Sequence, residues 1–161
     1  MSTLTTERTI ARSLMETKLF DRLVATLARD HRMTLPRATR VMDQALAYLA
    51  TCAQRPVGSP VLSPSPTVDL GWHVFLQYTE PYDRWFASHR WRKVHHHPFD
   101  EQGVAYEPAS VVIPRTVDAI ETAGFAVDEE LWAATSLNCS QGGAPKNCGD
   151  DGKGGNEPTG C

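Results

Sequence analysis

Apolar residues recur with the period of an α-helix along most of this chain, and that spacing limits the fold to a helical one. Between residues 36 and 50 they occupy the i, i+3, i+4, i+7, i+8 and i+11 positions: Ala38, Val41, Met42, Ala45, Leu46 and Leu49. This stripe is typical of an amphipathic helix with one buried face. Thr34 fits the N-cap and Pro36 the first turn. A helix is therefore predicted to follow Thr34.

Two neighbouring segments carry the same spacing. Residues 14–29 are predicted to form a helix that makes an antiparallel hairpin with the one after Thr34. A longer helix is predicted over residues 65–88, with Ser65 as its N-cap and Pro66 in its first turn. Pro81 lies inside that pattern, and its ring excludes one backbone hydrogen bond. The helix is therefore predicted to kink or divide near Tyr78.

The second half of the chain is less regular but still helical in pattern. A fourth helix is predicted to begin near Pro114 and to end at Gly124, which supplies the C-cap. Asp128 is predicted to cap one further short turn. No pair of alternating segments joined by turn residues is visible, so strands are not expected. The prediction is an all-α fold, a small bundle of four to five helices in a domain of residues 1–137.

The composition changes abruptly at residue 138. Residues 138–161 contain seven of the eleven glycines and no large apolar residue, so they cannot bury enough surface to become ordered. They are predicted to form a flexible, disordered tail that carries Cys139, Cys148 and Cys161. These cysteines lack the paired C-x2-C spacing of zinc ribbons. Together with Cys52 they are expected to be thiols in a reducing compartment.

Charge and hydropathy exclude several function classes. The net charge of −3 and the scattered basic residues give no footprint for nucleic acid. No run approaches the roughly 18 apolar residues of a membrane span, and the N-terminus has no apolar signal core. The expectation is a cytoplasmic protein that binds neither nucleic acid nor membrane.

The chemistry-bearing residues gather in two places. Asp69 and His73 stand four apart in the predicted helix 65–88, which puts them on one face within contact range. His95, His96 and His97 follow as a tract before Pro98, which favours an extended backbone. In an extended run, His95 and His97 point to one side and His96 to the other. One or two of these histidines could therefore meet His73.

Three interpretations of these residues stay open. Asp69 and His73 could be a hydrogen-bonded pair that only stabilises the start of the helix. They could be an acid–base pair with His73 as the base, although no nucleophile is evident nearby and the catalytic residues are unknown. Lastly, Asp69, His73, His95, His96 and His97 could supply the ligands of a zinc or iron ion, with Asp69 as a ligand or as the group that orients His73.

The stretch SPTVDLGWHVFLQYTEPYDRWF, followed by VHHHP, resembles the motif of the small bacterial members of the glycine-rich domain-containing protein-like family. The likeness covers about residues 14–135. It implies a helical domain with a D-x-x-W-H element at Asp69, Trp72 and His73 and an H-H-x-P element at the histidine tract. It implies no activity that can be transferred. The tract in this chain has three histidines where two are typical of the family.

The leading hypothesis is a metal-binding helical protein. One alternative is a precursor or carrier whose tail is modified or cleaved by a partner enzyme. Another is a module for protein interaction alone. The tail cysteines could also bind a soft ion such as Cu(I) or zinc and deliver it to the histidines.

Overall fold

A computed structural model describes residues 8–96 and 107–133 of the chain. It begins with a 3-10 turn, Ala11–Leu14. The α-helices that follow are α1 (Thr17–Asp30), α2 (Leu35–Gln54), α3 (Pro66–Gln77), α4 (Thr79–His89), α5 (Ala109–Thr122) and α6 (Glu129–Trp132). The described ranges contain no strand, and an isolated bridge joins Thr9 and Phe125. The predicted all-α fold is confirmed.

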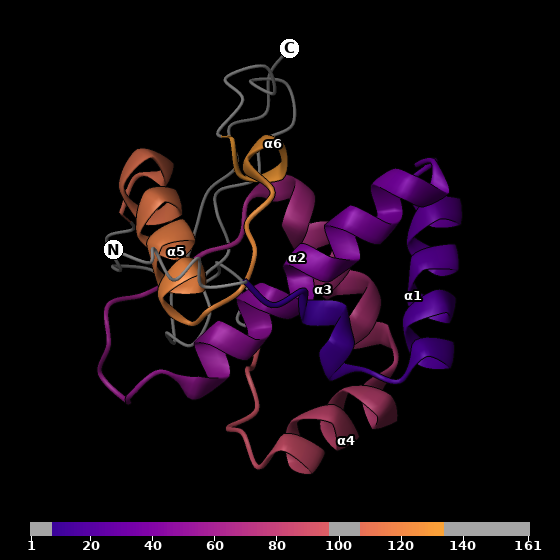
Figure 1. Cartoon of the computed structure of the whole chain (residues 1–161), viewed down its shortest axis with the longest axis horizontal. Coiled ribbons are helices and arrows are strands. Elements are labelled where there is room, and N and C mark those ends of the chain that lie inside the picture. Colours follow the sequence, from indigo (N-terminus) through magenta and orange to yellow (C-terminus); the bar gives the residue numbers. More distant parts are fainter. Residues whose placement is uncertain (1–7, 97–106, 134–161) are drawn as a thin grey trace, which may run out of the picture.

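Helix α2 forms the centre of the molecule, and the other helices are arranged around it (Figure 1). Every residue from Ala45 to Ala53 is buried, which fits a helix that is covered on most of its circumference. Helix α1 packs against α2 after the short turn at residues 31–34, and α3 crosses α2 closely at Gly71. This contact fixes the helix that carries the candidate site.

The predicted helix starts are confirmed in detail. The Thr34 hydroxyl accepts from the Arg37 amide at 3.4 Å, and the Ser65 hydroxyl accepts from the Val68 amide at 3.2 Å. The predicted division near Tyr78 is also confirmed, because α3 ends at Gln77 and α4 begins at Thr79. Pro81 falls in the first turn of α4, where a backbone N–H would have no partner within the helix.

The predicted start of the fourth helix near Pro114 is wrong. Helix α5 begins at Ala109, and Pro114 lies inside it. The missing Pro114 amide would have bonded to the carbonyl of Ser110, which is an exposed residue that water can reach. Burial of Val112 and Ile113 stabilises the turn before the proline. Gly124 ends the helix as predicted, with φ at 89° and the Phe125 amide donating to the Ile120 carbonyl.

The short turn after Asp128 is present as α6, but the Asp128 side chain does not cap it. Its carboxylate instead accepts from Arg40 Nε at 2.6 Å and Nη2 at 2.8 Å. Buried Gln44 joins the same region to α2, since its amide oxygen accepts from the Asp128 amide at 3.1 Å and the Trp132 indole at 2.7 Å. These contacts hold α6 against the central helix.

Cys52, in the last turn of α2, departs from expectation. It is disulfide-bonded, so the expectation of a free thiol is wrong at this position. The tail with Cys139, Cys148 and Cys161 lies outside the described residues, as does His97.

Within residues 8–96 and 107–133, none of the helices has both the length and the apolar character that crossing a bilayer demands.

Candidate metal site

Asp69 and His73 lie on the face of α3 that borders the core, as the spacing predicts. The Ser65 cap starts the helix, which places Asp69 in the first turn, where the helix dipole favours a carboxylate. His73 follows one turn later, and its Nδ1 lies 3.2 Å from Asp69 Oδ2. The Asp69 side chain is 12 % exposed and that of His73 is 31 % exposed. The pair is thus anchored at its carboxylate end and partly open at its imidazole end.

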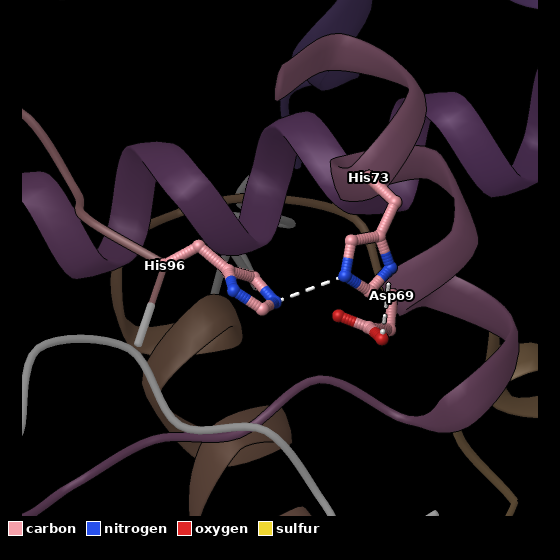
Figure 2. A group of neighbouring side chains, drawn as sticks. All are labelled: Asp69, His73 and His96. Atoms are coloured by element: carbon pink, nitrogen blue, oxygen red, sulfur yellow. Dashed lines mark hydrogen bonds and ion pairs between the residues drawn. The ribbon is translucent and has the colours of Figure 1, made fainter. Parts of the chain in front are cut away.

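His96 completes the group from a different part of the chain. It follows α4 in a short segment, residues 91–96, in which Val94 is buried, His95 exposed and His96 half-buried. This alternation turns His96 toward α3. Its Nε2 lies 2.9 Å from Nε2 of His73, and Figure 2 shows the two rings with these nitrogens facing one another.

Nδ1 of His73 lies within ion-pair distance of an Asp69 oxygen. A carboxylate accepts hydrogen bonds, so this neighbour favours the tautomer with the hydrogen on Nδ1. With the ring neutral, Nε2 of His73 then presents a lone pair toward His96. A carboxylate on one nitrogen and an available lone pair on the other is the usual arrangement of a histidine that ligates a metal.

Asp69, His73 and His96 form a group that could hold a metal ion. One ligand atom from each residue lies within 4.8 Å of the other two. Two imidazoles and a carboxylate are donors that zinc and non-haem iron both accept. The structure brings these three of the five predicted ligands together. His95 is exposed and is not part of the group, and His97 is outside the described residues.

Aromatic residues form the inner wall of the site. The Trp72 ring lies 4.8 Å from the His96 ring, centre to centre, and its indole N–H donates to the Tyr82 hydroxyl at 3.0 Å. The Tyr82 hydroxyl in turn donates to the Val94 carbonyl at 2.7 Å. Burial raises the pKa of Tyr82 well above its usual value, so this hydroxyl stays protonated and remains a donor.

Sequence reasoning missed the role of this Trp72–Tyr82–Val94 chain. In the sequence, nothing distinguishes Tyr82 and Trp72 from ordinary core aromatics. The available signal was that a buried Tyr hydroxyl and a buried Trp indole each require a hydrogen-bond partner. That rule states the need for a partner but does not say where the partner lies along the chain.

The chain matches no protein-family model, no curated protein and no solved structure. The interpretation of the site therefore rests on its own geometry.

Proposed function

We propose that this protein binds a transition-metal ion between Nε2 of His73 and Nε2 of His96, with Asp69 as the group that orients His73. The observation that carries this proposal is the approach of the two Nε2 atoms to 2.9 Å. These atoms come from residues 23 apart in the sequence, and both are the metal-ligating atoms of neutral imidazole.

The distance supports a shared ion. With metal–nitrogen bonds of about 2.1 Å, two ligand nitrogens lie about 3.0 Å apart at a right angle and about 3.4 Å apart at a tetrahedral angle. The observed separation is close to the first value, and a small rotation of either ring reaches the second. Without a metal, a hydrogen on Nε2 of His96 would be donated to Nε2 of His73. To bind an ion, His96 would take the other neutral tautomer, with its hydrogen on Nδ1, which leaves the Nε2 lone pair for the metal.

Asp69 fits the orienting role better than the role of a ligand. Its oxygen lies against Nδ1 of His73, the nitrogen that faces away from His96. A carboxylate in that place fixes the tautomer and raises the basicity of the ligating nitrogen. The proposed ligand set is then His73 and His96, completed by water, by a substrate or by a residue outside the described ranges. Zinc and iron are the proposed ions.

Such an ion would have open coordination positions on a partly exposed face. Bound water at those positions would become more acidic, which is the chemistry that a metal supplies to hydrolytic sites. No reaction is proposed. Membership of the glycine-rich domain-containing protein-like family and a cytoplasmic location are also proposed. An oxidising compartment is the alternative location, because Cys52 is disulfide-bonded. Cell fractionation of the host tests the location.

The experiment is elemental analysis of untagged wild-type protein, His73→Ala and His95→Ala, each before and after reconstitution with Zn(II) or anaerobic Fe(II). The proposal expects near-stoichiometric metal in the wild type and in His95→Ala, and its loss in His73→Ala. His95 is the matched control, because it belongs to the same histidine tract but faces away from His73. Metal-free wild type after reconstitution would show that Asp69, His73 and His96 are a hydrogen-bonded chain without metal.

A further inference from the structure

The segment that carries His96 begins at Trp91, which stacks on His89, and its polar side chains make mostly exposed contacts with the helices. Lys93 pairs with Asp83 at 2.9 Å, but both side chains are substantially exposed, and such surface pairs hold a chain weakly. Arg92 reaches the carbonyls of Cys52 and Arg55 at 3.5 and 3.4 Å, which are long hydrogen bonds. Neither contact is strong enough to fix an imidazole to within a few tenths of an ångström.

Val94 is buried in the core, and the Tyr82 hydroxyl adds a buried hydrogen bond to its carbonyl. This hydroxyl receives the indole N–H of Trp72 from α3 and donates to the carbonyl of Val94, two residues before His96. Tyr82 and Trp72 are 3 % and 0 % exposed, so water does not compete with either bond. Trp72 also contacts the His96 ring directly. One hydroxyl therefore joins the helix that carries His73 to the segment that carries His96.

We propose that Tyr82 is a positioning residue that sets the separation of His73 and His96 through the Trp72–Tyr82–Val94 chain, an inference that rests on the proposed metal site. Without the hydroxyl, the Val94 carbonyl loses its donor, and the His96 segment is held less tightly against α3, by the buried Val94 side chain and the ring contacts of His96. The metal then has to order that segment itself when it binds, so affinity falls although no ligand is removed.

Tyr82→Phe tests this, with Tyr48→Phe as its matched control. Tyr48 is also buried and also contacts the Trp72 ring, but its hydroxyl donates to the Leu62 carbonyl at 3.4 Å and not to the Val94 carbonyl. Two quantities are measured: the dissociation constant for Zn(II), by calorimetric titration, and amide hydrogen exchange of residues 91–96. Thermal unfolding shows that each variant is folded.

The expected result is an increase in the Zn(II) dissociation constant on the order of tenfold in Tyr82→Phe. Exchange in residues 91–96 accelerates in the same variant, and Tyr48→Phe changes neither quantity. Trp72→Phe, which keeps a ring against His96 but removes the indole donor, should give a smaller effect of the same sign.

Equal affinity and equal exchange in Tyr82→Phe and Tyr48→Phe would overturn the positioning role. Faster exchange with unchanged affinity would also overturn it, because the segment would then be held without consequence for the metal. A wild type that binds no Zn(II) is a different failure. It refutes the proposed function, and the exchange comparison alone then decides whether Tyr82 holds the segment.

Discussion

Gly71 of α3 lies directly against Ala45 of α2: a Cβ atom added at Gly71 would stand 2.9 Å from the Ala45 Cβ and 3.3 Å from the Val41 carbonyl oxygen. The two helices therefore approach as closely as they do because one of them has no side chain at the crossing. Asp69 and His73 flank this glycine on either side, so the crossing also places the candidate site.

Gly71→Ala is expected to lower the free energy of unfolding by about 1–3 kcal/mol, because the new methyl group overpacks a contact between two helix backbones. Urea denaturation measures the change. Ala45→Gly in the same chain should restore part of the loss, since it removes the closest atom but leaves the Val41 carbonyl. If Gly71→Ala were as stable as the wild type, α2 and α3 would be able to move apart at this crossing without loss of unfolding free energy.

Asp69→Asn and Asp69→Ala separate the two roles that a carboxylate can have beside His73. Asparagine still offers an oxygen to the Nδ1 hydrogen but has no charge, so an orienting role predicts roughly tenfold weaker Zn(II) binding and a larger loss for alanine. A direct ligand predicts that both variants lose the metal to the same extent. Calorimetric titration of the two proteins under one buffer condition distinguishes these results.

His96→Ala is expected to abolish Zn(II) binding as completely as His73→Ala, because two-point attachment is lost in either case. His95→Ala is expected to bind like the wild type. Strong Zn(II) binding by His96→Ala together with weak Zn(II) binding by His95→Ala would make His95 the metal ligand in place of His96. That result would contradict the observed orientation of these two histidines.

The ion pairs of Arg40 make the attachment of α6 dependent on pH. The Arg40 guanidinium donates to Asp128 and Glu130, and these hydrogen bonds lower the pKa of both carboxyl groups in the folded protein. A carboxyl with a depressed folded pKa stabilises the fold above its unfolded pKa and loses that contribution as pH falls through the folded value. Arg40→Gln should therefore unfold at a lower temperature than the wild type near neutral pH.

The same linkage between protonation and folding predicts that the effect of Arg40→Gln on the unfolding temperature is lost in acid. Below the folded pKa of Asp128 and Glu130 the difference between Arg40→Gln and the wild type should disappear. Arg29→Gln serves as the control, because the ion pair of Arg29 is with its neighbour Asp30 in the same helix. A difference in midpoint that persists unchanged into acid would show that Arg40 stabilises α6 through packing and not through charge.

The sequence predicted those features that depend on neighbouring residues. Thr34 and Ser65 are helix caps because each acts on an amide three residues away, and the break at Tyr78 follows from Pro81 nearby. The i, i+4 contact of Asp69 and His73 is local for the same reason. The extended backbone predicted for residues 95–97 correctly placed the side chains of His95 and His96 on opposite sides. The sequence did not show which side faces α3.

The features that were mispredicted or missed depend on distant partners. The local sequence favours Asp128 as a helix cap. Its carboxylate instead accepts a hydrogen bond from Arg40, which lies 88 residues away in the sequence. Pro114 is tolerated inside α5 because the helix buries apolar residues before it. The Tyr82 hydroxyl donates to the carbonyl of Val94, which lies 12 residues later in the chain, beyond the end of α4. Local rules specify elements, and the tertiary arrangement decides which polar groups meet.

An ion held by His73 and His96 would also act as a reversible cross-link. It would close a loop of 23 residues, and the unfolded chain would have to release the ion or keep its ends together at a loss of entropy. Because stabilisation by a bound ligand grows with the logarithm of its free concentration, the protein would have no single melting temperature. Its resistance to unfolding would follow the metal content of its surroundings.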